Sequence, residues 1–393
     1  MRRDSILTST HEQKTQSNSE NTTQPKSVGL IVNPVAGMGG TVGLKGTDGK
    51  TILYKAITLG AKPVAPARAE VFLTALSPSK YGINLIVGAG DMGENEAANC
   101  CVPCTVFGEK KDETTAEDTK RIAKKMRDIR VSLLVFCGGD GTARDILQAV
   151  GMSIPVLGVP TGVKMHSAVF AVTPEAAARV ARGFLWGELP LREAEVMDID
   201  EQAFREGRVS AELCGYALTP YEPHLVQENK VASPLTENEL RNQAAIATYI
   251  IELMQPEVLY IIGPGTTTRI IGDLLDVKKT LLGVDIFCNK NIVVHDASEK
   301  QILAAISDKR AQIIVTPIGG QGFIFGRGNQ QISPKVIRRV GLDNIIVVAT
   351  ESKLRGLKGL RVDTGDLDLD AAIRAHGVKV ISDYKVEYIM PVE

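Results

Sequence analysis

The segment Gly138-Gly139-Asp140-Gly141-Thr142 combines the features of a phosphate-binding turn with a carboxylate in its middle. It follows an apolar run and precedes a helical pattern, so we expect a strand, a tight turn and a helix in succession. Glycines allow the backbone to approach a ligand closely, and the N-terminus of a helix offers free amide donors to a phosphate. Asp140 can then hold a metal ion, or accept a proton from a hydroxyl that attacks a phosphoryl group. The alternative is that Asp140 only caps the following helix.

A second glycine-rich segment, residues 33–49, follows the first apolar run of the chain. Its backbone amides can wrap a triphosphate. It is not a Walker A loop, because the stretch from Gly43 to Gly49-Lys50-Thr51 has one residue too many for the required spacing. The alternative is a flexible surface loop. The candidate nucleotide-binding residues in this segment are Asn33, Gly37, Gly39, Lys45 (as a charge partner), Thr47 and Asp48.

Residues 158–171 form a third segment that leaves an apolar run and enters a helical pattern. Thr161 and Gly162 are its candidate nucleotide-binding residues. Lys164 and His166 can also reach a ligand, although His166 is as readily a structural histidine as a catalytic one.

The fourth segment, residues 263–269 (GPGTTTR), again opens a helix after an apolar run. Its candidate binding residues are Gly265, Thr266, Thr267, Thr268 and Arg269, which together can hold an anion or a ribose. The threonine hydroxyls can instead serve only as caps, and Arg269 can pair with Asp273 at helical spacing.

Short apolar runs alternate with helical patterns through the first half of the chain. This alternation predicts βαβ units and a doubly wound parallel, Rossmann-like sheet. Because such sheets bind ligands at the carboxyl ends of their strands, the glycine-rich segments should meet in one crevice. The predicted strands are 28–33, 83–88, 105–107, 132–137 and 155–159, and the predicted helices are 51–59, 64–76, 116–127 and 143–150.

The pattern changes after Trp186, where residues 194–200 and 208–217 read as the two strands of a hairpin. Later strands are expected at 258–262, 313–315, 345–349 and 378–381, with helices at 236–253 and 270–275 and a glycine-rich stretch at 317–331. We therefore predict an α/β protein with a disordered polar tail (1–26), a nucleotide-binding domain (27–187) and a second, more β-rich domain (188–393) whose C-terminal segment can return to the first.

Composition restricts the class of partner. The formal net charge of −1 provides no basic field for nucleic acid. No apolar stretch has the length of a membrane span, and the N-terminal tail lacks the apolar core of a secretory signal. The six cysteines form no disulfide framework or zinc site by their spacing. These features predict a cytoplasmic protein.

Taken together, these segments resemble the NAD kinase superfamily, which also contains diacylglycerol and sphingosine kinases. The strand–GGDGT–helix unit is the signature of that superfamily, and Asn33-Pro34 followed by Gly37 looks like its early loop. Residues 154–170 resemble its next turn, the hairpin resembles the opening of its second domain, and Gly265 to Thr268 look like its "TGSTAY" segment. The resemblance covers most of the chain after residue 27, and it is greatest for the predicted ATP–NAD kinase branch that includes acetoin-catabolism protein X.

The resemblance implies a kinase that uses ATP or polyphosphate as donor, Mg²⁺ or another divalent cation, and a hydroxyl acceptor. In NAD kinases the acceptor is the 2′-hydroxyl of the adenosine ribose, and the aspartate corresponding to Asp140 is the proposed base. Relatives often assemble, so we expect a homo-oligomer.

One departure from the family pattern leaves alternatives open. NAD kinases carry an Asn-Glu or Asn-Asp pair on the hairpin, whereas residues 211–217 (AELCGYA) have none. The alternatives are a kinase for another hydroxyl metabolite (acetoin-related, polyol or lipid) and a regulator that binds NAD or ATP without turnover.

Overall fold

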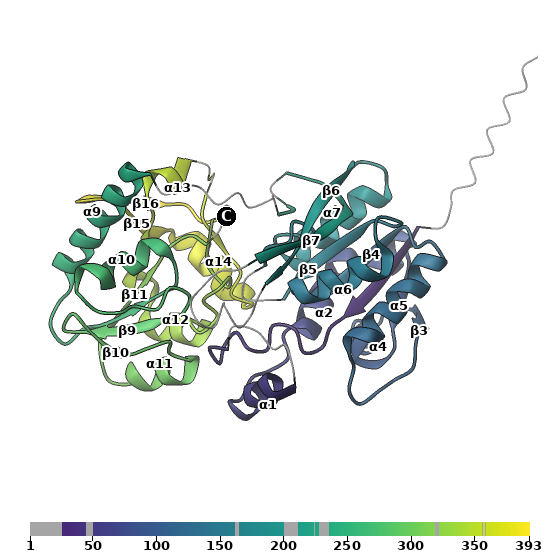
Figure 1. Ribbon diagram of the computed structural model, residues 1–393, viewed down its shortest axis with the longest axis horizontal. Helices are drawn as coiled ribbons and strands as arrows, with labels where there is room; N and C mark the ends of the chain where they lie inside the picture. Colours follow the sequence, from purple (N-terminus) through teal and green to yellow (C-terminus); the bar gives the residue numbers. More distant parts are fainter. Residues whose placement is uncertain are drawn as a thin grey trace, which may run out of the picture.

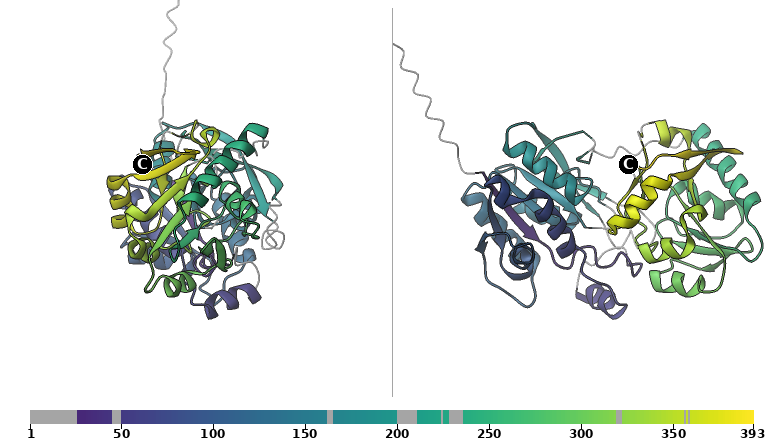
Figure 2. Two further views of the ribbon diagram at one scale, coloured as in Figure 1. Left: turned by 90° about the vertical axis from the view of Figure 1, so that its left-hand side faces the viewer. Right: turned by 180° about the vertical axis from the view of Figure 1, so that it is seen from behind.

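The computed structural model describes residues 26–44, 50–161, 165–199, 211–223, 225–227, 236–318, 322–355, 357 and 359–393. Within these ranges the chain forms two α/β units that lie side by side along the long axis (Figure 1). When the molecule is turned by 90°, one unit lies in front of the other (Figure 2). The fold class predicted from the sequence is confirmed.

The first unit is built on a parallel sheet of five strands in the described part of the chain, in the order β3-β2-β1-β4-β5. Because the middle strands are buried on both faces, their sequences are continuous apolar runs such as Leu133–Gly138 (LLVFCG). All five strands point the same way, so their carboxyl ends share one edge. The strands are β1 (Ser27–Val32), β2 (Asn84–Gly88), β3 (Cys104–Phe107), β4 (Leu133–Gly138) and β5 (Val156–Pro160).

Helices cover both faces of the first sheet. Residues of α2 and α7 pack on one face in a core with Leu30, and residues of α5 and α6 pack on the other with Ile31. Helix α5 begins with a capping box formed by Thr115 and Asp118. The helices are α1 (Lys50–Thr58), α2 (Ala65–Leu76), α3 (Pro78–Tyr81), α4 (Glu94–Asn99), α5 (Ala116–Asp128), α6 (Asp140–Val150) and α7 (Pro174–Leu185), with a 3₁₀ turn at Gly90–Met92.

The predicted hairpin consists of β6 (Leu191–Ile199) and β7 (Ala211–Pro220), paired antiparallel. Its buried side chains Ala194, Val196 and Ala217 share a core with α5 and α6. The hairpin is thus packed on the first sheet, while the domain boundary at residue 187 stays a prediction.

The second unit contains a seven-stranded mixed sheet within the described residues, in the order β10-β9-β8-β11-β13-β15-β16. Its central strands β8, β11, β13 and β15 are parallel, and antiparallel strands lie outside them. The strands are β8 (Leu259–Ile262), β9 (Asp285–Cys288), β10 (Asn291–Val294), β11 (Ala311–Val315), β13 (Ile345–Val348), β15 (Val378–Asp383) and β16 (Val386–Met390), with a separate pair β12 (Phe323–Phe325) and β14 (Arg361–Val362).

Helices also cover both faces of the second sheet. One face carries α9 and α10 in a core with Ile262, and the other carries α11, α12 and α14 in a core with Ile261. The sequence reading missed β9, β10 and β16. Strands β10 and β16 lie at the edges of the sheet and are largely exposed, so they carry no continuous buried apolar run. The helices are α9 (Glu237–Leu253), α10 (Thr266–Leu274), α11 (Glu299–Ala305), α12 (Pro334–Val340), α13 (Glu351–Arg355) and α14 (Leu367–His376), with a 3₁₀ turn at Leu342–Asn344.

In the described part of the chain, no helix has both the length and the apolar character needed to cross a membrane.

Candidate functional site

The GGDGT segment lies at the carboxyl end of β4, where helix α6 begins at Asp140 with Gly139 as its N-cap residue. The helix therefore starts three residues earlier than the sequence indicated. A Cβ on Gly138 would lie 2.4 Å from Thr142 Oγ1, so this position accepts only glycine without a shift. Gly139 and Gly141 are partly exposed beside the buried Asp140. Their backbone is thus within reach of a ligand at the helix N-terminus.

Asp140 does not cap α6; its carboxylate bridges to the loop that follows β5. One oxygen accepts the backbone N–H of His166 at 2.8 Å and the other accepts that of Ser167 at 2.9 Å. The side chain is only 6% exposed. Two amide donors therefore fix the orientation of the carboxylate at the edge of the sheet, which is the arrangement a positioned base requires.

Asn33, Gly37 and Thr161 meet beside this turn. The Asn33 amide donates to Thr142 Oγ1 at 2.9 Å, which ties the carboxyl end of β1 to α6. Gly37 has φ of +81°, and a Cβ there would lie 2.0 Å from the carbonyl oxygen of Thr161. Thr161 is 4% exposed, and its hydroxyl has no hydrogen-bond partner among the described residues. Three segments that are far apart in sequence thus converge at one edge, as the parallel sheet requires.

Several predicted site residues cannot be placed in this geometry. Lys45, Thr47, Asp48, Gly162 and Lys164 lie outside the described residues. Gly39 is buried, and its carbonyl accepts the amide of Leu44 at 2.9 Å.

The predicted segment of the second unit lies at the carboxyl end of β8. Gly265 has φ of +132° and precedes α10, whose first intrahelical bond runs from the amide of Arg269 to the carbonyl of Gly265 at 3.1 Å. Thr268 donates its hydroxyl hydrogen to Gly263 O at 2.8 Å, which ties the first turn of α10 to the end of β8 and does not cap the helix. Arg269 pairs with Asp273 at 3.4 Å, as the alternative reading anticipated, and both side chains are about half exposed.

The carboxyl edges of the two sheets approach each other through the loop after β1. The amide of Glu299, at the start of α11, donates to Thr41 O at 3.1 Å. A Cβ on Gly43 would lie 3.7 Å from Asp296 O and 3.9 Å from the Gln331 side-chain nitrogen. The first unit's glycine-rich loop therefore lies against the second unit near the segment that ends at Gln331.

An ion triad also joins the units. Arg68 on α2 donates to both oxygens of Asp363, at 2.6 and 2.7 Å, and Arg327 lies 3.5 Å from the same carboxylate. Arg327 also donates to the carbonyl of Val172 in the first unit. The glycine-rich stretch 317–331 had been noticed in the sequence, but no signal within it pointed to Arg327 or to its distant partner Arg68.

No group of three or more His, Cys, Asp or Glu side chains in the described residues is placed to hold a metal ion.

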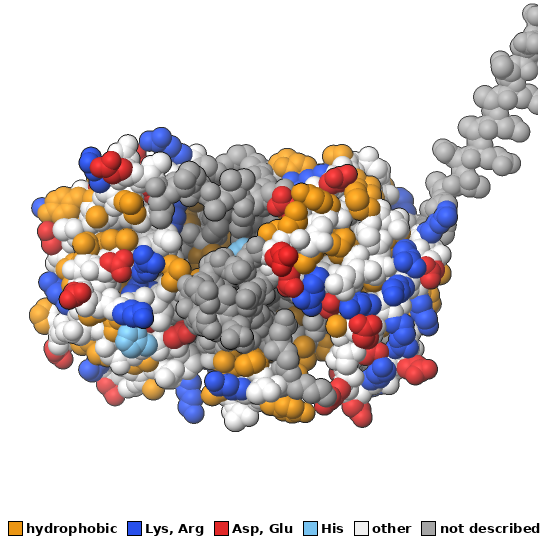
Figure 3. Space-filling view, in the orientation of Figure 1, with side chains coloured by type: hydrophobic (Ala, Val, Ile, Leu, Met, Phe, Trp, Pro, Cys, Tyr) orange, Lys and Arg blue, Asp and Glu red, His pale blue; other side chains and the backbone are white. Residues whose placement is uncertain are grey.

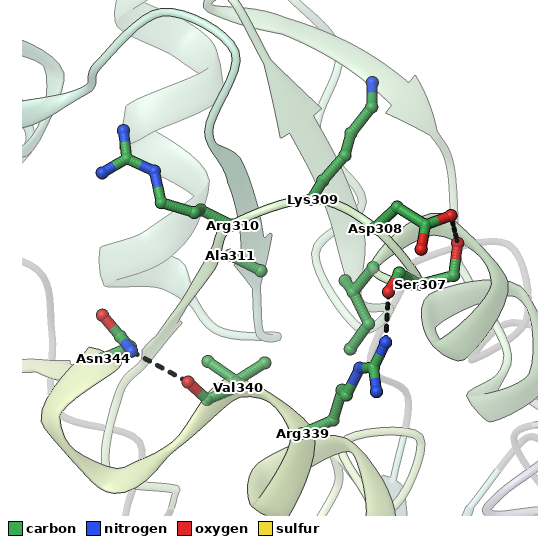
Figure 4. Close-up of a pocket in the computed structure, with 9 residues that line it drawn as sticks. Ser307, Asp308, Lys309, Arg310, Ala311, Arg339, Val340 and Asn344 are labelled. Atoms are coloured by element: carbon green, nitrogen blue, oxygen red, sulfur yellow. Dashed lines mark hydrogen bonds between the residues drawn. The ribbon is translucent and has the colours of Figure 1, made fainter.

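The second sheet also carries a surface depression of about 400 Å³. It lies at the amino end of β11, away from the carboxyl-end segments described above. It is lined by Lys309, Arg310 and Arg339 among others (Figure 4). On the face shown in Figure 3, basic and acidic side chains are interspersed over both units.

Comparison with known families agrees with the site geometry. Residues 28–189 match the model of the ATP-NAD kinase N-terminal domain, and residues 255–391 match that of the ATP-NAD kinase C-terminal domain. The chain belongs to the ATP-NAD kinase family. The two matches include the GGDGT segment, the loop after β1 and the start of α10.

Comparison with curated proteins found no match. Two similar solved structures come from Bacillus anthracis str. Sterne: a candidate diacylglycerol kinase (17% identity, 45% of this chain, 46% of that chain, TM-score 0.22) and a diacylglycerol kinase (16%, 45%, 47%, 0.21). The chain thus spans less than half the length of each of these structures. The family assignment rests on the two family models.

Proposed function

We propose that this protein is a phosphotransferase that moves a phosphoryl group from ATP, or from polyphosphate, to a hydroxyl of NAD. The observation that carries the proposal is the position of Asp140 at the N-terminus of α6. At this end of the helix Asn33 binds Thr142, and Gly37 packs against Thr161. Membership of the ATP-NAD kinase family in both halves of the chain supports the same reaction.

In this proposal the chain contributes positioning and charge stabilisation more than covalent chemistry. Backbone amides at the start of α6 hold donor phosphates, and Asp140 accepts the proton of the attacking 2′-hydroxyl. The amides of His166 and Ser167 keep the carboxylate in one orientation toward an acceptor hydroxyl. A divalent cation bound with the donor would neutralise phosphate charge.

A second acceptor class remains a candidate because of the hairpin. Glu212 is exposed and stands opposite Asp198 in the register of β6 and β7, and no Asn-Glu pair is present in residues 211–217. An acceptor other than NAD, such as an acetoin-related compound or a polyol, would not need that pair.

Phosphorus NMR of the full chain with ATP, Mg²⁺ and NAD tests the proposal. We expect a new 2′-phosphomonoester signal, and we expect Asp140→Asn to form it about 100-fold more slowly or less. Asp145→Asn is the matched control, because Asp145 is a buried carboxylate on the same helix that lies 3.5 Å from Arg144.

The asparagine variant presents an NH₂ group to one of the two loop amides, so its urea unfolding must be compared with that of the wild type. Unchanged turnover in a folded Asp140→Asn variant would end the role of Asp140 as base. ATP binding without any product from NAD would remove NAD as acceptor and direct the assay to small hydroxyl metabolites.

A further inference from the structure

Helix α1 projects from the body of the molecule beside the junction of the two units. The views of Figures 1 and 2 all show it standing away from both sheets. It follows the loop after β1, whose Gly37 packs against Thr161, and it precedes α2, whose Arg68 binds Asp363. A partner of α1 would therefore lie next to the place where the two units meet.

The side chains that α1 turns to solvent are largely apolar. Tyr54 is 57% exposed and Ile57 is 51% exposed, and their spacing places them on the same face of the helix. Leu59, directly after the helix, is also 51% exposed, whereas Ala56 faces the body and is fully buried. Large apolar side chains that are exposed together, and not singly, mark an interaction surface.

The charge around these side chains is positive. Between residues 49 and 69 the sequence holds basic residues but no aspartate or glutamate, although the whole chain has a net charge of −1. Lys55 and Lys62 are exposed, and neither forms an ion pair with another described residue. Hydrophobic and basic side chains lie together at the lower edge of Figure 3, where Figure 1 places α1. The helix thus suits a partner that is negatively charged at its surface and apolar beneath it.

An anionic phospholipid surface combines these two properties. Helices that lie in a membrane interface bury apolar side chains at the boundary of the acyl chains, while their lysines meet the headgroups. Tyrosine suits that depth because its ring is apolar and its hydroxyl is polar. A second copy of this chain fits less well, because a two-fold contact between two α1 helices would bring the same lysines of both copies together.

We propose that α1 attaches this protein to the surface of anionic membranes. Tyr54, Ile57 and Leu59 enter the interface, and Lys55 and Lys62 meet the lipid phosphates. The attachment is peripheral and reversible, because one short helix buries few apolar side chains. The proposal does not rest on the kinase function.

Sedimentation of the full chain with vesicles tests the proposal. Vesicles of phosphatidylcholine and phosphatidylglycerol should carry the protein down at low salt, and vesicles of phosphatidylcholine alone should not. Added salt should weaken the binding, because exposed charges are screened. Ile57→Ser and Lys55→Glu should each lower the partition coefficient for anionic vesicles by about tenfold, since one removes an apolar side chain and the other reverses a charge at the membrane surface.

Two substitutions far from α1 serve as matched controls. Ile389→Ser changes an isoleucine that is 70% exposed on the edge strand β16. Lys309→Glu reverses an exposed lysine at the amino end of β11 (Figure 4). Neither control should change vesicle binding, and all four variants should unfold in urea as the wild type does, because the substituted side chains are exposed.

Absence of binding to anionic vesicles would overturn the proposal, as would equal losses in the α1 variants and their controls. Vesicle binding that survives both α1 substitutions would also overturn it. Analytical ultracentrifugation identifies the other partner. A concentration-dependent dimer that Ile57→Ser abolishes, in a protein that binds no vesicles, would show that α1 contacts a second copy of the chain instead of a membrane.

Discussion

Asp363 offers the sharpest test of how the two units are joined. Its carboxylate is 7% exposed and binds the guanidinium of Arg68 through both oxygens, and Arg327 lies 3.5 Å away. Asp363→Asn keeps the shape of the side chain but removes its negative charge. The guanidinium groups of Arg68 and Arg327 are then left without their anion. Breaking one side of a buried ion pair costs about 3–5 kcal/mol, so we expect the free energy of unfolding to fall by that amount.

Asp366→Asn provides a control of the same chemistry on the surface. Asp366 pairs with Arg338 at 2.9 Å, and both side chains are substantially exposed, so the loss of stability should be much smaller than for Asp363→Asn. Asp366 also caps α14 by accepting the amide of Leu369. Asparagine caps a helix equally well, so the substitution isolates the ion pair.

Urea unfolding should be followed by two probes. Trp186 is the only tryptophan in the chain and belongs to the first unit, while circular dichroism reports on both units. In Asp363→Asn we expect the two transitions to separate, because the units lose the buried ion pairs among the contacts that couple them. The triad does not hold the units together if the free energies of unfolding of Asp363→Asn and Asp366→Asn differ by less than about 1 kcal/mol and the transitions seen by the two probes still coincide.

The stability difference between wild type and Asp363→Asn should depend on pH, because the pKa of Asp363 differs between the folded and unfolded chain. Burial would raise this pKa, but the guanidinium groups of Arg68 and Arg327 outweigh burial and lower it. The unfolded chain therefore binds the proton at a higher pH than the folded one, and the stabilisation is present above the unfolded pKa. It should be lost as pH falls through the folded pKa, so that wild type and Asp363→Asn converge in acid.

Two further predictions concern the first unit. Burial raises the pKa of Glu96 to about 7 and its side chain is 3% exposed, so its contribution to stability is present below pH 4.5 and is lost as pH rises through 7. Glu96→Gln should therefore be more stable than wild type at pH 8 and not at pH 4.5 in thermal melts; an equal effect at both values would contradict the buried carboxyl. Gly37→Ala and Gly60→Ala both place alanine at positive φ, which costs about 1–2 kcal/mol. In Gly37→Ala the new Cβ would also lie 2.0 Å from the carbonyl oxygen of Thr161, so this variant should lose much more stability and ATP affinity than Gly60→Ala. Equal losses in the two variants would show that the loop can move away from Thr161.

Local patterns in the sequence were sufficient for the first sheet and for the turn at its centre. Apolar runs bounded by glycine identified β1, β2, β4 and β5 within about two residues, because buried parallel strands leave continuous apolar sequence. The GGDGT segment was placed correctly at the junction of β4 and α6, although α6 already begins at Asp140, because a glycine-rich turn between a strand and a helix has a local signature. The hairpin and the helix α9 also followed from neighbouring residues.

Contacts between distant residues were decided only by the tertiary structure. No sequence pattern joins Asp140 to the amides of residues 166 and 167, Arg68 to Asp363 across 295 positions, or Lys353 to Thr267. The same holds for the parallel centre of the second sheet, whose strands are brought together by helices and loops of variable length. Strand and helix periodicity is set by residues a few positions apart, whereas these contacts depend on how whole elements pack, which is why the charged partners appeared only in the folded chain.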